Sequence, residues 1–138
     1  MRVVGIDLGT RRIGVAVSDA TGTLASPYSI LLRSGDRVAD HRAVADMVAT
    51  LEAERVVVGL PLSLSGEAGA AAEAALAEVE ELAATLPVPV ETYDERLTTV
   101  TADRALAAAG IKGRDRRKVI DAAAAAVMLQ AWLDGRKR

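Results

Sequence analysis

Two acidic residues occupy positions at which a carboxylate requires a partner. Asp7 ends a short run of Val, Ile and Gly residues within 2–10, which predicts a strand buried on at least one face. Asp121 lies in the stretch 119–133, where Gln130 is the only other polar residue, so this stretch predicts a buried helix. A carboxylate in such surroundings is costly unless it is paired, hydrogen-bonded or bound to a metal.

A further acidic position follows another strand-like run. Residues 88–93 are β-prone and lead directly into Asp94 and Glu95. Successive side chains of a strand point to opposite faces, so only one of these two acids should face a site at the end of the strand. The residues alone also allow structural roles, because Asp7 could form a turn. Asp121 could be neutralised by an arginine or by the dipole at the start of its helix.

Several carboxylates in a chain with no Cys and a single His suit a hard metal ion that prefers oxygen ligands. Mg²⁺ is bound by one or two carboxylates together with substrate phosphates. Two such ions about 4 Å apart can activate a water and stabilise the leaving oxygen of a phosphodiester. The single histidine, His41, lies between Asp40 and Arg42 in a predicted helix, and we expect it at the surface rather than in a site.

The elements that would position these acids alternate in the manner of an α/β domain. We predict three strands, a helix, a strand, a helix, a strand and two helices, at residues 2–10, 13–18, 23–33, 36–54, 55–61, 67–86, 88–93, about 98–110 and about 115–134. Short connections favour antiparallel pairing of the first three strands, and helical crossovers favour two later strands parallel to the first. The predicted fold is a mixed five-stranded sheet with helices on both faces, forming one domain over 1–138. Ligands bind such sheets where the carboxyl ends of parallel strands meet.

Smaller features refine this arrangement. Pro27 predicts that the third strand lies at an edge, because proline cannot donate to a β-ladder. We expect the acids of the second long helix, 67–86, on its solvent-facing surface. The apolar faces of the first and second helices are predicted from spacing to contain Val38, Val44, Met47, Val48 and Leu51, and Leu76, Val79, Leu82 and Leu86.

The net charge of −2 conceals a segregation along the chain. Residues 1–55 are balanced, residues 56–95 have eight acids and no base, and residues 96–138 have ten bases and four acids. The basic segment indicates either a polyanion partner or a solvated helical face. Aromatic residues are too few for a platform that stacks single-stranded bases. No stretch is apolar enough for a membrane span and no signal-like segment opens the sequence, so we expect a cytoplasmic protein.

Ordered motifs along nearly the whole chain resemble those of the YqgF/RuvX family, whose fold is RNase H-like. The four matching segments are Gly5-Ile6-Asp7-Leu8-Gly9-Thr10 with 12–19, then 57–61, 94–99 and 120–130.

This resemblance implies a metal-dependent nuclease that uses Mg²⁺ or Mn²⁺. Its acidic residues would be Asp7, Glu95 and Asp121, with Asp94 as the alternative to Glu95. Family members are described as nucleases that mature the 5′ end of pre-16S ribosomal RNA and as Holliday junction resolvases, and we rank the first substrate higher. A resolvase acting on a symmetric junction would require two sites and hence a homodimer, and the residues do not decide between monomer and homodimer.

Two other functions remain in view. One is a non-catalytic RNase H-like module that only binds nucleic acid or a protein partner. The other is a sugar kinase with a similar Asp-Leu-Gly-Thr opening, but such kinases need a second large domain, for which this chain is too short.

In a nuclease, basic residues would contact phosphates on either side of the cleavage point and position the backbone without reading its sequence. The candidates lie just beyond Asp7, directly after Glu95 or before Asp121, and they are Arg11, Arg12, Arg96, Lys112, Arg114, Arg116, Arg117 and Lys118.

Removing the charge of Arg116, Arg117 and Lys118 together is expected to weaken nucleic-acid binding and to flatten its dependence on salt. The reason is that each phosphate contact releases counterions when it forms. Affinities measured over a series of salt concentrations check this, and an unchanged slope would identify the basic segment as a merely solvated surface.

Overall fold

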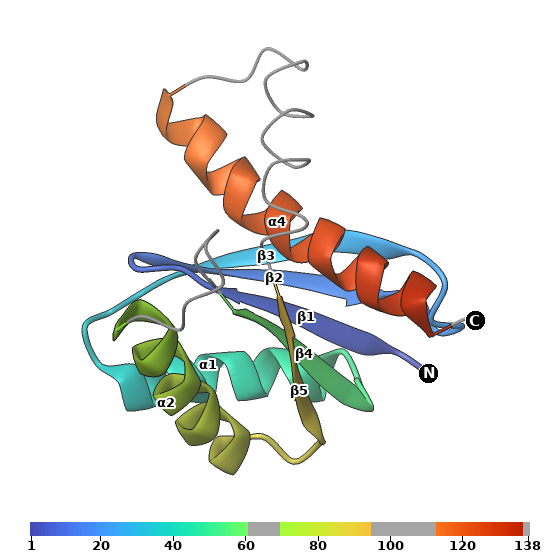
Figure 1. Ribbon diagram of the computed structural model, residues 1–138, viewed down its shortest axis with the longest axis horizontal. Helices are drawn as coiled ribbons and strands as arrows, with labels where there is room; N and C mark the ends of the chain where they lie inside the picture. Colours follow the sequence, from blue (N-terminus) through green and yellow to red (C-terminus); the bar gives the residue numbers. More distant parts are fainter. Residues whose placement is uncertain (61–69, 95–112, 137–138) are drawn as a thin grey trace.

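The computed structural model describes residues 1–60, 70–94 and 113–136, with side chains from residue 73 in the second range and from residue 122 in the third. Within these ranges one sheet has the strand order β3-β2-β1-β4-β5 (Figure 1). β2 is antiparallel to both β1 and β3, whereas β4 is parallel to both β1 and β5. The predicted mixed sheet is therefore confirmed, and the strand with Pro27 lies at an edge. The strands are β1 (Val3–Leu8), β2 (Arg12–Ser18), β3 (Ala25–Leu32), β4 (Arg55–Leu60) and β5 (Val90–Asp94).

Helices cover both faces of the sheet, as predicted. α1 (Arg37–Thr50) and α2 (Ala70–Thr85) lie on one face, and α4 (Gly113–Gly135) lies on the other (Figure 1). Among the helices of the described ranges, none is both long and apolar enough to cross a bilayer.

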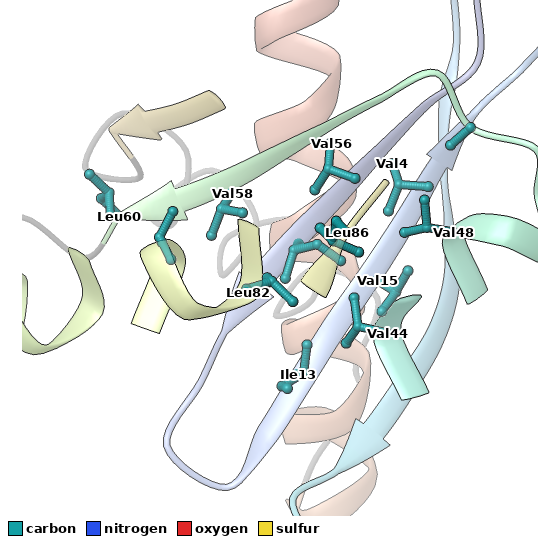
Figure 2. Close-up of a cluster of buried hydrophobic side chains, with 13 residues drawn as sticks. Val4, Ile13, Val15, Val44, Val48, Val56, Val58, Leu60, Leu82 and Leu86 are labelled. Carbon is teal, nitrogen blue, oxygen red and sulfur yellow. The ribbon is translucent and has the colours of Figure 1, made fainter. Parts of the chain in front are cut away.

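The larger core, here called the α1/α2 core, lies between the sheet and these two helices (Figure 2). Full burial of one Val or Leu side chain stabilises a fold by about 1.5 to 3 kcal/mol, so this cluster supplies much of the driving force. Its buried members are Val4, Ile6, Ile13, Val15, Val44, Val48, Ala53, Val56, Val58, Leu60, Val79, Leu82 and Leu86.

A second core, here called the α4 core, lies on the opposite face of the sheet. α4 packs tightly against Gly5 of β1. A Cβ atom at this position would lie 2.9 Å from Cβ of Leu129 and 3.2 Å from the carbonyl oxygen of Ala125, so only glycine permits the approach. The buried members of this core are Val3, Ala16, Val57, Ala125, Met128, Leu129, Trp132 and Leu133.

α4 runs antiparallel to β1. Its C-terminal end lies near the N-terminus of the chain (Figure 1), and Gly22, next to the carbonyl oxygen of Met1, is close to Leu133. Gln130, one of two polar residues in the apolar stretch, ties the helix to β3, because its side-chain oxygen accepts the backbone N–H of Ala25 at 2.9 Å. The basic N-terminal part of α4 therefore points toward the carboxyl end of β1.

The helices differ from the predictions in two side chains. Val38 and Leu76 are 61% and 43% exposed, although spacing predicted them on apolar faces. The reason is that the first buried turn of α1 is polar, with Asp40 and His41, and that Glu78 occupies a buried position on α2.

The helix boundaries also differ from the predictions. α1 is shorter than the predicted 36–54, because Asp36 caps its start by accepting the N–H of Ala39 and the helix ends at Thr50. The predicted helix at about 98–110 lies outside the described residues.

Substituting Gly5→Ala is expected to lower the free energy of unfolding by about 1 to 3 kcal/mol, because the added methyl group is forced against α4. Urea denaturation followed by circular dichroism measures the change. Gly135→Ala is the matched control, since a Cβ atom there meets no heavy atom within 4 Å. Equal stability of the two variants would contradict the close approach of helix and sheet.

Candidate active site at the carboxyl end of β1

Asp7 lies on the α4 side of the sheet, at the carboxyl end of the central strand. Val4 and Ile6 of β1 belong to the α1/α2 core, and Val3 belongs to the α4 core. Alternation along the strand therefore places Asp7 on the same face as Val3 and Gly5. Its side chain is half-buried, and Asp7 pairs in register with Gly14 of β2 and Gly59 of β4. The residues in register with Asp7 on both neighbouring strands are therefore glycines, which add no side chain there.

Asp94 lies on the opposite face. It pairs in register with Leu60, which belongs to the α1/α2 core. Tyr93 packs against the α4 core, and Glu91 accepts a hydrogen bond from Nε1 of Trp132 in α4 at 3.1 Å. The alternation of β5 therefore turns Asp94 away from the face of Asp7. Glu95 lies outside the described residues.

The backbone of α4 brings position 121 toward the end of β1. Asp121 comes one helical turn before Ala125, the residue whose carbonyl lies next to Gly5. From Gly5 to Asp7 the strand advances about 6.6 Å, and from Ala125 back to position 121 the helix advances about 6 Å. Because α4 and β1 are antiparallel, both steps advance toward the end of the sheet at which β1 has its carboxyl end. The side chain of Asp121 is outside the described part of the chain.

The turn between β1 and β2 is tight. The N–H of Gly9 donates to the carbonyl oxygen of Asp7 at 3.1 Å. A Cβ atom on Gly9 would lie 2.5 Å from the carbonyl oxygen of Arg12, so the turn requires glycine at this position. Arg33, just after β3, contacts the turn twice: its N–H donates to the carbonyl oxygen of Arg11 at 2.9 Å, and its Nε donates to that of Gly9 at 2.8 Å.

The same arginine belongs to a buried charged cluster, here called the Glu78 cluster and made of Arg33, His41 and Glu78. The two terminal nitrogens of Arg33 donate to the two carboxylate oxygens of Glu78 at 2.8 and 2.9 Å. Nε2 of His41 lies 2.8 Å from Oε2 of Glu78. The side chains of His41 and Glu78 are 3% and 7% exposed.

This cluster corrects two sequence predictions. His41, expected at the surface, is buried, and so is Glu78, although the acids of α2 were expected to face solvent. The physical reason is that the hydrogen bonds among His41, Glu78 and Arg33 compensate the cost of burying these polar groups at the junction of α1 and α2. A sequence signal was available, because Glu78 precedes Leu82 by one turn and His41 precedes Val44 by three residues, so both lie on apolar stripes.

The contacts within the cluster shift the pKa values of Glu78 and Arg33. Burial raises the pKa of the Glu78 carboxyl, but hydrogen bonds from Arg33 and His41 outweigh that effect, so its pKa lies below the ordinary value of 4.5. The hydrogen bond to Glu78 likewise raises the pKa of Arg33. Glu78 and Arg33 are therefore both charged at neutral pH.

Two open cavities flank the β1–β2 turn on the side of the Glu78 cluster. They measure about 490 and 360 Å³ and share Thr10, Arg33 and Arg37 in their walls. The turn thus borders open cavities on the α1/α2 side of the sheet, whereas Asp7 lies on the α4 side.

Of the predicted phosphate-contacting residues, only Arg11 and Arg12 have side chains in the described part of the chain. Arg11 is exposed at the turn, and Arg12 is half-buried, with an Nε atom that is buried and has no hydrogen-bond partner within the described ranges. Alternation along β2 puts Arg12 on the α4 side, as for Asp7, because Ile13 belongs to the α1/α2 core. Arg96 and Lys112 lie outside the described residues. The backbone of the other four, Arg114, Arg116, Arg117 and Lys118, is in the first turns of α4.

The Asp7 carboxylate at this edge fits a hard divalent cation. Within the described part of the chain no three His, Cys, Asp or Glu side chains gather into a metal-binding set. Glu95 and the side chain of Asp121 lie outside that part. What is described is one oxygen donor, Asp7, half-buried beside glycines in a chain without cysteine. That donor chemistry suits Mg²⁺ or Mn²⁺ and excludes a thiolate site.

The strand order and the helical layers define an RNase H-like protein. The solved structure "T. thermophilus RuvC in complex with Holliday junction substrate" has the same fold, with a TM-score of 0.59 and 22% identity over 99% of this chain and 96% of that one. A family model described as "RuvX: Holliday junction resolvase" matches residues 1–135, and the chain belongs to this RuvX family.

Curated relatives are similar over most of their length. A Rhodococcus opacus (strain B4) protein named "Putative pre-16S rRNA nuclease" is 50% identical over 99% of this chain and 79% of its own. A protein of the same name from Mycobacterium ulcerans (strain Agy99) is 49% identical over 99% of this chain and 80% of its own.

Substituting Glu78→Gln is expected to lower the free energy of unfolding at pH 7 by about 3 kcal/mol, because Arg33 loses its buried counter-charge. Since the pKa of Glu78 is lowered by folding, its contribution is complete above pH 4.5 and is lost as the pH falls below that value. The difference between wild type and variant should therefore shrink in acid.

Urea denaturation at several pH values measures this difference. Glu81→Gln is the control, because Glu81 is on the same helix and pairs with Arg37 but is 54% exposed. Its effect should stay within about 1 kcal/mol. A Glu78→Gln penalty that is independent of pH would contradict the assigned charge state.

Proposed function

We propose that this RuvX-family protein is a metal-dependent endonuclease that hydrolyses phosphodiester bonds during 5′-end maturation of pre-16S ribosomal RNA. The observation that carries the proposal is the position of Asp7. It is a half-buried carboxylate at the carboxyl end of the central strand, on the face covered by the helix that contains Asp121. Sheets of this kind bind ligands at that edge.

In this proposal Asp7, Glu95 and Asp121 hold Mg²⁺ or Mn²⁺. The outward turn of Asp94 on the other face supports Glu95 as the acid from the third motif. When bound, the metal would lower the pKa of a coordinated water and stabilise charge on the leaving oxygen. The protein's own part is to fix the carboxylates and to hold the scissile phosphate between them.

Arginines near Asp7 are suited to hold that phosphate. Arg12 lies on the same face of the sheet, and its buried Nε lacks a partner within the described ranges, so a phosphate oxygen would satisfy a donor that is otherwise costly to bury. Arg11 extends the positive charge along the turn. The basic residues of 112–118 would bind the backbone on the other side of Asp121.

The names of the curated relatives favour ribosomal RNA over branched DNA as the substrate, and such processing would occur in the cytoplasm. The alternative substrate is a Holliday junction, which is supported by the description of the family model. Junction resolution would require two sites and therefore a homodimer, whereas processing of one RNA strand needs only a monomer.

Cleavage of precursor 16S ribosomal RNA and of a four-way DNA junction, side by side with Mg²⁺ and with chelator, tests the proposal. Asp7→Asn is expected to reduce Mg²⁺-dependent cleavage at least about 100-fold, because losing a metal ligand removes several kcal/mol of transition-state stabilisation. Asp46→Asn, exposed on α1, is the matched control and should retain activity.

The two acids of the third motif are compared in the same assay. Glu95→Gln should lose activity as Asp7→Asn does, and a larger loss for Asp94→Asn would reverse the assignment. Undiminished cleavage by Asp7→Asn would rule out the site, and a wild type that binds precursor RNA but never cleaves it would favour the non-catalytic module.

A further inference from the structure

The Glu78 cluster calls for an explanation beyond stability. Buried ion pairs usually contribute little net free energy, because the loss of hydration offsets much of the attraction. Here Arg33 and Glu78, with 16% and 7% of their side chains exposed, are fixed by two charge-assisted hydrogen bonds, and His41 contacts the same carboxylate. Such a cluster holds its members in one geometry.

That geometry leads directly to the candidate active site. The Nε of Arg33 donates to Gly9, and its backbone N–H donates to Arg11, so one residue binds the turn on both sides of Thr10. The N–H of Gly9 in turn donates to the carbonyl oxygen of Asp7. Three hydrogen bonds in series, Glu78 to Arg33, Arg33 to Gly9 and Gly9 to Asp7, thus connect the buried carboxylate of Glu78 to the backbone of Asp7.

The backbone of the turn is tightly packed at Gly9. Gly9 is so close to the carbonyl oxygen of Arg12 that a Cβ atom would lie 2.5 Å from it. Asp7 itself pairs in register with Gly14 and Gly59 on the neighbouring strands. Arg33 holds the turn that directly follows β1 by hydrogen bonds to Gly9 and Arg11.

We propose that Arg33 is a positioning residue for Asp7: its guanidinium, oriented by Glu78 and His41, fixes the β1–β2 turn and thereby sets the direction in which the Asp7 carboxylate meets the metal. The inference rests on the proposed function, since it concerns the same metal site. In this proposal Arg33 acts on Asp7 through the turn, by its bonds to Gly9 and Arg11. Outer-shell groups of this kind change metal affinity or activity by about 10- to 100-fold when they are mutated.

Arg33→Lys tests the inference because it keeps the charge but loses the planar fork. A lysine has one nitrogen and cannot bond Gly9 and both oxygens of Glu78 at once. The matched control is Arg55→Lys. Arg55 also forms a partly buried ion pair, with Glu91, and also joins two elements, β4 and β5, but it does not contact the turn.

Two readouts are independent of catalysis. Hydrogen exchange of the backbone amides of residues 9–12 should become about 10-fold faster in Arg33→Lys and stay unchanged in Arg55→Lys. Binding of Mn²⁺, followed by the electron paramagnetic resonance of the free ion with Asp7→Asn as the blank, should weaken about 10-fold in Arg33→Lys only. In the cleavage assay kcat should fall while KM for the nucleic acid stays unchanged.

Equal amide exchange, or equal Mn²⁺ binding, in Arg33→Lys and Arg55→Lys would overturn the inference. If Arg33→Lys weakens Mn²⁺ binding as expected but the wild type cleaves neither RNA nor junction, only the proposed nuclease function would be overturned. If Arg33→Lys does not fold, Glu78→Gln takes its place, because it removes the charge that orients Arg33 and leaves the arginine present. The same two readouts then decide.

Discussion

Burial of β1 and β4 on both faces is the constraint on which the rest of this molecule depends. Val3, Val4 and Ile6 of β1 and Val56, Val57 and Val58 of β4 are fully inaccessible to solvent. Strands enclosed in this way have no place for a charge except at their ends. The chemistry of the protein is therefore confined to the sheet edge, and the helices that enclose the strands also decide what can be brought to that edge.

The two faces of the sheet divide the work. The α4 side receives Asp7 and presents a helix with a basic start, whereas the other side contains the larger core and the Glu78 cluster. The β1–β2 turn is the place where the two sides meet, because Arg33 reaches it from one face while Asp7 points to the other. A residue far from any substrate can thus influence a carboxylate through a single turn.

Much of this fold could be predicted from the sequence, because apolar runs of strand length, helical crossovers and Pro27 are local signals. The position of Asp7 at the end of a buried strand was of the same kind. The face to which Asp94 points was not, because the phase of a short strand is decided by its packing, here through Tyr93 and Trp132. Roles that came from family resemblance rather than from the residues stand as proposals.

The Glu78 cluster escaped prediction for a different reason. His41 and Glu78 are each of a type that is rarely buried alone, and only their mutual contact makes burial possible. A single sequence gives no measure of such a pairing between two residues on different helices that are 37 positions apart in the chain. The stripe positions of both residues were visible, but the partner was not.

The close approach of α4 to Gly5 has a mechanical consequence. The helix packs tightly against Gly5 at Ala125 and Leu129, and from Ala125 its backbone extends 12 residues toward the N-terminus, to Gly113. At 1.5 Å per residue this is a lever of about 18 Å, so a tilt of about 10° at the contact would move the basic end of the helix by about 3 Å. That displacement is comparable to the spacing between adjacent ligands of a bound cation. Gly5 is thus the point about which α4, the longest helix in the described part of the chain, would tilt.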